Sequence, residues 1–327
     1  LCGLILILST LFLFKTSNIS LFIVSGLPAS TVNSFISLKS NLSNNPLINV
    51  SISSGVKVVG VPPPKYNVSI VSLNVLLNGK SYRETDLEND WFYKEMSKSP
   101  SIPTSSQPSI DDFYKAIESQ VKEGHDIVGI FLSSDMSGTF STSNLVKEMI
   151  LEKYPNANIV MIDSRSNCMQ AGYAILEAAK AAADNKSLDE VVSIAKSVIE
   201  NSKFIFVPDT LDYLKKGGRI GGAAALFGSL LQIKPILTVT DGKTTVLTKV
   251  RTKKKAIDKI IDTVMEQNLK SPIKGLIVHH INCESEGQEL ANKLQDKLGI
   301  SNIKIQSIGP IIGLHVGPGS IGVAYHY

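Results

Sequence analysis

The 327-residue sequence has little cysteine and no metal-binding motif. Its three cysteines, Cys2, Cys168 and Cys283, are widely separated, and no C-x-x-C pair occurs. This spacing argues against a disulfide framework or a zinc ribbon and favours a reducing compartment. The five histidines include the adjacent pair His279 and His280, whose side chains point to opposite faces on a strand. The sequence therefore predicts no metal site and no cofactor.

The sequence also lacks a strong net charge. Its formal charge is only +4, with 19% charged and 43% hydrophobic residues, which is typical of a globular protein and not of a nucleic-acid-binding one. The basic residues of the run 249–255 are local, and such a run commonly forms the solvated start of a helix. A chain of this length is sufficient for two domains.

The amino-terminal part carries no recognisable domain pattern. Residues 4–14 are apolar but fall short of the roughly 20 residues that span a bilayer. They could form the apolar region of a signal peptide, so targeting remains open, although we expect a cytoplasmic protein. Residues 31–45 are rich in serine and asparagine. We expect residues 1–46 to form an extension of unknown role.

Residues 47–200 alternate between strand-like and helix-like segments. Apolar strand patterns at 68–77, 126–132 and 158–162 are separated by helical patterns, the last two strands being followed by helices near 142–151 and 169–183. This alternation predicts an α/β domain with a parallel sheet. Ligands of such sheets meet the loops beyond the carboxyl ends of the strands, where Asp163 and the loop 133–139 are expected.

Residues 201–327 have a different pattern. Strand patterns at 236–239 and 245–250 flank Asp241-Gly242, which is typical of a hairpin, and helical patterns follow at 256–265 and 288–298. Hairpins mixed with helices predict an α+β second domain. The glycines near Arg219 and the segment Gly242-Lys243-Thr244 match neither a dinucleotide fingerprint nor a complete phosphate-binding loop.

Two loops carry candidate binding residues. The loop 133–139 places hydroxyls and a glycine ahead of a helix, which suits either an anion site or a simple helix cap. His315 lies in a glycine-rich segment, where backbone can approach a ligand closely. An enzymatic alternative is a lipid or ester hydrolase with Ser137 as nucleophile, His315 as base and Asp163 as orienting residue, although no G-x-S-x-G motif is present.

Six sequence blocks together resemble one protein family. They are PTSSQPS at 103–109, SGTF at 137–140, DS at 163–164 with Met169 and Gly172, TLDYLKKGGRI at 210–220, GSL and IKPIL at 228–237 with VRT at 250–252, and HVGPG at 315–319. Their residue types and order are similar to those of the DegV family, from about residue 67 to residue 325. Four sites depart from the family pattern: Ser105 replaces a threonine, Cys168 replaces a serine, Ile52-Ser53-Ser54 stands where the family has T-D-S, and Lys57-Val58-Val59 stands where it has D-L-P.

The resemblance implies a lipid carrier. DegV proteins have an N-terminal α/β domain and a C-terminal α+β domain, with a long-chain fatty acid bound between them. Several are the binding subunit of a bacterial fatty acid kinase in phospholipid metabolism. By motif, Ser105, Ser137 and His315 would hold the carboxylate. The supporting pocket network would comprise Gly138, Thr139, Arg219 and Gly317.

The resemblance also implies which partners the chain would bind. Arg251 matches a position used for docking the kinase. The chain itself would not be an enzyme, since the kinase would carry out the catalysis. Its partners would then be the long-chain fatty acid and the fatty acid kinase, with transient membrane contact and no nucleic acid.

Overall fold

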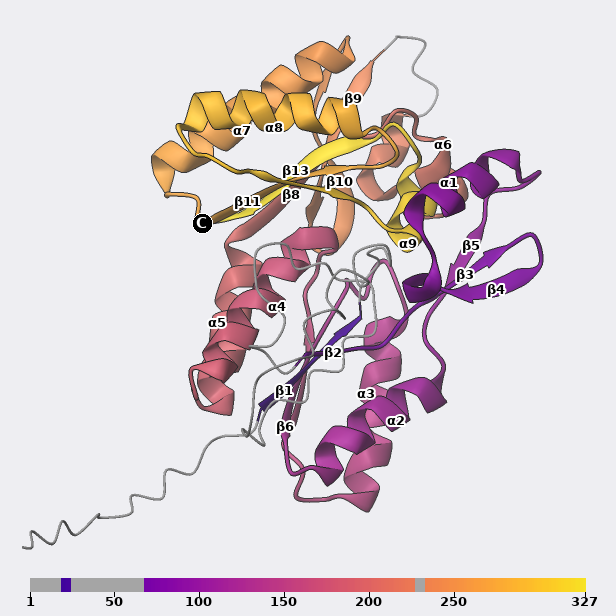
Figure 1. Cartoon of the computed structure of the whole chain (residues 1–327), viewed down its shortest axis with the longest axis vertical. Helices are drawn as coiled ribbons and strands as arrows, with labels where there is room; N and C mark the ends of the chain where they lie inside the picture. The colour runs from indigo at the N-terminus through magenta and orange to yellow at the C-terminus, as the bar shows by residue number, and fades with distance from the viewer. Residues whose placement is uncertain (1–18, 25–67, 227–232) are drawn as a thin grey trace, which may run out of the picture.

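The computed structural model describes residues 19–24, 68–226 and 233–327 and folds them into two lobes (Figure 1). The first lobe contains a parallel sheet and the second a six-stranded mixed sheet, so the predicted combination of an α/β and an α+β domain is confirmed. The proposed division between residues 200 and 201 falls between helix α5 (Leu188–Glu200) and strand β8 (Ser202–Val207).

The first lobe is built on a four-stranded sheet whose strands all run parallel. Their order is β2 (Val68–Ile70), β1 (Ile19–Val24), β6 (Asp126–Phe131) and β7 (Ile159–Asp163). Successive side chains of β6 point to opposite faces, and both faces are buried. Ile127 and Phe131 pack against α2 (Ile110–Lys122) and α3 (Thr139–Lys153), whereas Val128 and Ile130 pack against α4 (Cys168–Ala183) and α5.

The position of β1 corrects the expectation for the amino-terminal segment. Residues 19–24 lie inside the sheet, between β2 and β6, and do not belong to an extension that precedes the domain. This segment, ISLFIV, is apolar enough for a central strand, but it lies outside the stretch that matches the family motifs. The segments 1–18 and 25–67, including the expected first strand at Ile52-Ser53-Ser54, lie outside the described residues.

A small antiparallel sheet sits where the two lobes meet. Its strand order is β4 (Lys80–Arg83), β3 (Asn74–Leu77) and β5 (Thr104–Ser106). In the chain, the short helix η4 (Glu84–Asp86) and helix α1 (Asn89–Lys98) come between β4 and β5. The strand predicted at 68–77 is therefore two strands, β2 and β3. The Asn78-Gly79 turn is confirmed, with φ values of 51° and 77° that suit a tight hairpin.

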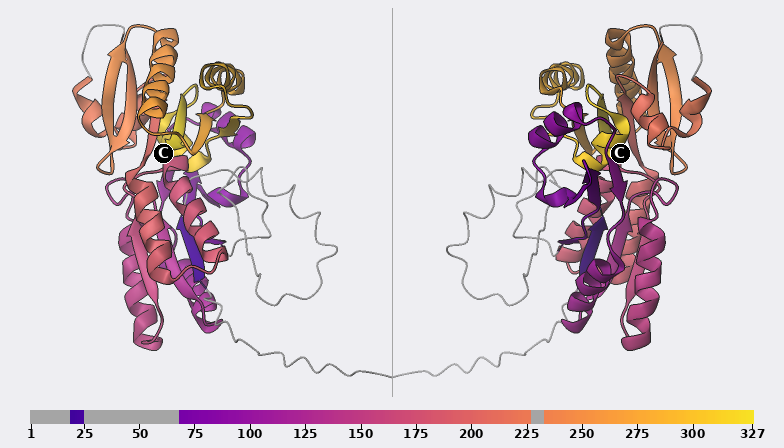
Figure 2. Two further views of the ribbon diagram at one scale, coloured as in Figure 1. Left: turned by 90° about the vertical axis from the view of Figure 1, so that its left-hand side faces the viewer. Right: turned by 90° about the vertical axis from the view of Figure 1, so that its right-hand side faces the viewer.

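The second lobe contains a six-stranded sheet with one helical layer on its outer face. The strand order is β10 (Lys243–Val250), β9 (Lys234–Thr240), β8, β13 (Ile321–His326), β11 (Gly275–His280) and β12 (Lys304–Ser307). The helices α7 (Lys253–Lys270) and α8 (Glu284–Leu298) cover one face (Figures 1 and 2). The other face carries Phe204 and Phe206 and belongs to the same apolar core as the first lobe.

Three short helical segments complete the second lobe. They are α6 (Asp212–Lys216), η5 (Gly221–Leu226) and α9 (Pro310–Val316), of which α6 and α9 pack together. Helix α9 also contacts α1 and β3, so it lies at the junction of the lobes. In the parts of the chain that the structure covers, no helix is long and apolar enough to cross a bilayer.

Candidate functional site

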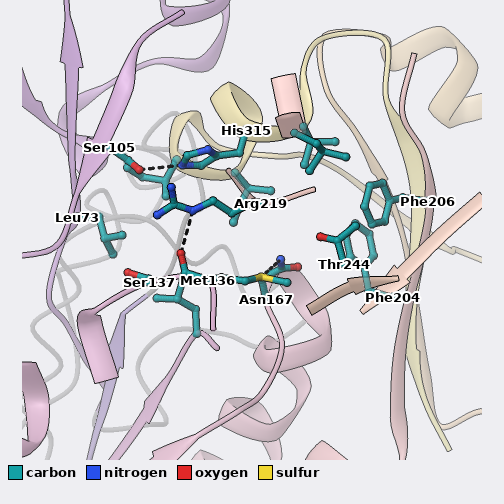
Figure 3. Close-up of a pocket in the computed structure, with 15 residues that line it drawn as sticks. Leu73, Ser105, Met136, Ser137, Asn167, Phe204, Phe206, Arg219, Thr244 and His315 are labelled. Atoms are coloured by element: carbon teal, nitrogen blue, oxygen red, sulfur yellow. Dashed lines mark hydrogen bonds between the residues drawn. The ribbon is translucent and has the colours of Figure 1, made fainter. Parts of the chain in front are cut away.

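A pocket lies between the two lobes and is lined by both (Figure 3). The space inside it, counted together with the open solvent at its mouth, is about 540 Å³. Most of its wall is apolar: Leu73, Leu132, Met136, Phe204, Phe206, Leu214, Ile311, Ile312 and Val316. The polar lining residues are Ser105, Ser137, Asn167, Arg219, Thr244 and His315. Such a cavity suits a mainly apolar ligand with a polar group.

His315 and Ser105 meet at one side of this pocket. His315 lies in the last turn of α9, which begins with Pro310 and ends at Gly317. Gly317 has a φ of 91° and packs against the Tyr213 ring, so its position requires glycine. Ser105 lies in the middle of β5, and its Oγ is 2.8 Å from His315 Nε2. This hydrogen bond joins the small sheet to the second lobe.

The His315 ring is held in its neutral form. Burial, reinforced by the positive charge of Arg219, lowers the pKa of His315 to about 4. Its Nδ1 atom is buried and has no hydrogen-bond partner among the described residues. Gly217 lies directly against Nδ1, and a Cβ atom at this position would collide with it. A neutral imidazole can donate one hydrogen bond and accept another.

Ser137 lies in the loop between β6 and α3. Its Oγ is 2.7 Å from Thr139 Oγ1 and accepts a hydrogen bond from the Thr139 backbone N–H at 3.3 Å. Gly138, the N-cap of α3, lies against the end of the flexible Gln107 side chain, which would have to move if a Cβ atom were added. When Thr139 donates to Ser137, the Ser137 proton is free to donate into the pocket.

Arg219 brings a positive charge to the same region. Its Nε donates to the Met136 carbonyl at 3.0 Å, and its Nη1 donates to the Gly217 carbonyl at 2.6 Å. A guanidinium has five donors, so further donors remain available. Within the described residues, no carboxylate forms an ion pair with Arg219. A half-buried cation whose hydrogen bonds to the described residues go to carbonyls favours an anionic ligand.

The structure does not assemble the hydrolase alternative. Asp163 accepts hydrogen bonds from the backbone N–H groups of Ser134, at 3.2 Å, and Arg165, at 2.8 Å. It does not reach His315, whose Nδ1 has no carboxylate partner in the described chain. Ser137 likewise bonds to Thr139 and not to His315. The hydrogen bonds that the predicted triad requires, between Ser137 and His315 and between His315 and Asp163, are therefore not formed in the described residues.

Arg251 lies away from this pocket. It is exposed in the short connection between β10 and α7 and is not among the residues that line the cavity. The described part of the chain contains no cluster of histidine, cysteine or acidic side chains suited to a metal ion.

Two residues that position α9 were not predicted from the sequence. The buried Glu84 carboxylate accepts a hydrogen bond from the Ile311 N–H at 3.1 Å, at the start of the helix that carries His315. The Tyr93 hydroxyl donates to the Ile308 carbonyl at 2.7 Å. Both contacts join residues more than 200 positions apart, which no local pattern reveals. Asn167 and Thr244 were also missed as lining residues.

Comparisons with known proteins agree with this fold. A family model described as "Uncharacterised protein, DegV family COG1307" matches residues 63–327. A DegV domain-containing protein of Clostridium acetobutylicum is 50% identical over 262 residues, covering 80% of this chain and 91% of the relative. One from Clostridium perfringens is 51% identical over 261 residues, covering 80% and 92%.

Solved structures show the same architecture. DegV from Bacillus subtilis, described as a fatty acid binding protein, has a TM-score of 0.76 with 26% identity and covers 95% of this chain and 99% of its own. The fatty acid kinase B3 protein of Streptococcus pneumoniae, loaded with linoleic acid, has a TM-score of 0.73 with 20% identity and covers 94% and 99%. The latter similarity supports the fold alone.

Proposed function

This chain belongs to the DegV family, and we propose that it binds a long-chain fatty acid in the pocket between its lobes and presents the acid to a fatty acid kinase. The observation that carries the proposal is the meeting of Ser105 and His315, beside Arg219, in the wall of an otherwise apolar pocket. The pocket offers an apolar wall for the acyl chain and polar groups for the carboxylate.

The apolar wall supplies most of the binding free energy in this proposal. Burying about fourteen methylene groups contributes on the order of 11 kcal/mol, at roughly 0.8 kcal/mol each. The loss of translational, rotational and side-chain freedom offsets a large part of this gain. The residual free energy still suits a tightly held ligand, and the aromatic rings of Phe204 and Phe206 provide a broad contact surface for an acyl chain.

The polar residues of the pocket hold the carboxylate. Ser105 and Ser137 donate through their hydroxyls, and His315 donates through a ring N–H or orients the Ser105 proton. Arg219 supplies the compensating charge without which a buried carboxylate would be strongly destabilised. Gly138, Thr139 and Gly317 shape the loops that place these donors.

Phosphoryl transfer is assigned to the partner kinase and not to this chain. Arg251 is exposed next to the exposed Lys254 and Lys255, and we assign it to docking of the kinase. A carrier of this kind would act in the cytoplasm and exchange its fatty acid during transient contact with the membrane. The similarity to the fatty acid kinase B3 protein is consistent with this arrangement at the level of the fold.

Extraction and mass spectrometry of the purified protein test this function. We expect a long-chain fatty acid at about one molecule per chain. The double variant Ser137→Ala/His315→Ala should lose the lipid but keep its circular dichroism spectrum, because both side chains are only partly buried in the pocket wall. A protein that is repeatedly recovered empty and cannot be loaded with stearic acid would exclude the proposal. Hydrolysis of an ester that depends on Ser137 would instead favour the enzymatic alternative.

A further inference from the structure

A second polar group lies within the pocket, on the side of Phe204 and Phe206. It consists of Asn167, from the loop between β7 and α4, and Thr244, from β10 (Figure 3). Both side chains line the cavity, and neither belongs to the proposed carboxylate residues Ser105, Ser137 and His315. The carboxylate proposal makes no use of them.

Asn167 is an N-cap residue that does not cap its helix. Asparagine at the start of a helix ordinarily accepts a hydrogen bond from a backbone N–H of the first turn. Asn167 precedes α4, yet its side chain makes no capping bond. Its Nδ2 donates instead to Met136 Sδ at 3.2 Å, a weak acceptor, and its Oδ1 has no partner among the described residues. The amide is thus turned away from the backbone and into the pocket wall.

Thr244 shows the same incomplete hydrogen bonding. Its side chain is only 4% exposed, and its hydroxyl makes no hydrogen bond within the described part of the chain. Two neighbouring threonines differ: Thr238 donates to the Phe204 carbonyl at 2.8 Å, and Thr245 donates to the Lys243 carbonyl at 3.2 Å. Because no described residue bonds to the Thr244 hydroxyl and its side chain lines the cavity, this hydroxyl is available to a molecule bound there.

An unsubstituted acyl chain cannot satisfy these groups. Methylene groups passing Asn167 and Thr244 would leave the amide oxygen and the hydroxyl without partners, which is unfavourable in a buried site. A hydroxyl on the chain can accept from Thr244 Oγ1 and, once the amide turns toward the cavity, donate to the buried Asn167 Oδ1. If the amide is rotated by 180°, the ligand hydroxyl accepts from Nδ2, and the complementarity is retained.

We propose that Asn167 and Thr244 form a subsite for a hydroxyl group on the acyl chain, so that the pocket prefers a hydroxylated long-chain fatty acid to the unsubstituted acid of equal length. This inference rests on the proposed function, since it requires a fatty acid in the pocket. It adds the ligand class and the two residues that select it.

Binding of stearic acid and of hydroxystearic acids that differ in hydroxyl position provides the test. Affinities are measured by competition with a fluorescent fatty acid. We expect at least one isomer to bind the unmodified protein about three- to tenfold more tightly than stearic acid, as for one added hydrogen bond. The double variant Asn167→Leu/Thr244→Val should lose this preference and bind stearic acid at least as well. Thr245→Val, on the same strand but outside the pocket, should retain it.

Two results would overturn the inference, and each can be told apart from failure of the proposed function. If stearic acid binds but every hydroxylated isomer binds equally or more weakly, the subsite is excluded and the carrier function stands. A preference that persists in the double variant would also exclude these two residues. If no acid binds, both the subsite and the carrier function are excluded.

Discussion

Ser105 Oγ lies 2.8 Å from His315 Nε2, although the two residues are 210 positions apart in the chain. The bond links β5 of the small sheet to α9 of the second lobe and places both groups in the pocket wall. Because Ser105 and His315 share this bond, removing either should disturb the other. Their contributions to carboxylate binding are therefore expected to be coupled.

A double-mutant cycle measures this coupling. Ser105→Ala and His315→Ala should each weaken stearic acid binding about tenfold or more, the range for a hydrogen bond to a charged group. The double variant should lose less than the product of the two single effects. Ser106→Ala, at the exposed neighbouring position of β5, is the control and should bind normally. Strictly additive losses, measured by calorimetry, would show that the two side chains act independently.

Gly217 provides a steric test of the same histidine. Its backbone φ of −75° is ordinary, but a Cβ atom would collide with His315 Nδ1 and lie 3.0 Å from the Tyr213 carbonyl oxygen. Gly217→Ala should therefore displace the imidazole and weaken fatty acid binding about tenfold, the effect of losing one charge-assisted hydrogen bond. Gly222→Ala is the matched control, since its nearest neighbour would be 3.7 Å away. If Gly217→Ala and Gly222→Ala bind the fatty acid with equal affinity, the placement of the His315 ring does not contribute to binding.

Two buried histidines should make the protein sensitive to acid. Burial lowers the pKa values of His315 and His279 to about 4, below the ordinary 6.5, so the unfolded chain takes up protons between pH 6.5 and 4 that the folded chain does not. Stability is therefore present above pH 6.5 and falls as the pH decreases. When the pH is lowered from 7 to 5, protonation of each histidine in the unfolded chain should reduce the free energy of unfolding by about 2 kcal/mol.

Urea unfolding of the lipid-free protein at these two pH values measures the loss. His279→Phe should reduce the difference between pH 7 and pH 5 by about 2 kcal/mol, since it removes one titrating group. The aromatic ring should preserve the packing against Phe204, whose ring centroid lies 5.8 Å from that of His279. A pH dependence that is the same in the variant and the unmodified protein would show that His279 does not remain neutral in the fold.

The fold class was predicted from local patterns, whereas the candidate carboxylate residues Ser105, Ser137 and His315 came from the resemblance to the DegV family. Alternating strands and helices indicate the α/β domain, and the turns at Asn78-Gly79 and Asp241-Gly242 indicate hairpins. Ser137 and His315 stand in short motifs rich in glycine, whose backbone freedom is a local requirement. Such features depend on neighbouring residues and can be recognised without knowledge of the tertiary structure.

Other parts of the site depend on contacts that only the fold creates. Glu84 is an acidic residue after a hairpin, and nothing nearby in the sequence indicates that it binds the start of α9. Asn167 was not singled out from the sequence, and only the fold brings its amide against Met136 in the pocket wall. The strand β1 was missed because its partners, β2 and β6, lie far from it in the chain.

The contact between the lobes at the β9–β10 hairpin gives a final prediction. Arg165 forms ion pairs with Asp135 at 2.5 Å and Asp163 at 3.5 Å and donates to the Asp241 carbonyl across the interface. The Ser133 hydroxyl donates to the Gly242 carbonyl at 2.7 Å. The next strand of this hairpin carries Thr244, so these bonds also hold one wall of the pocket.

Alanine substitutions at Gly242 and Gly79 distinguish the contact between the lobes from the backbone strain of a hairpin turn. Both occupy the second position of a hairpin turn, with φ values of 79° and 77°, so alanine at either should cost about 1–2 kcal/mol through backbone strain. A Cβ atom at Gly79 meets nothing within 4 Å, whereas one at Gly242 would lie 2.6 Å from both the Arg165 guanidinium and the Ser133 hydroxyl. Gly242→Ala should therefore destabilise the protein more than Gly79→Ala and also expose the hairpin to faster hydrogen exchange. Equal unfolding free energies and unchanged exchange in β9 and β10 would mean that the lobes do not depend on this contact.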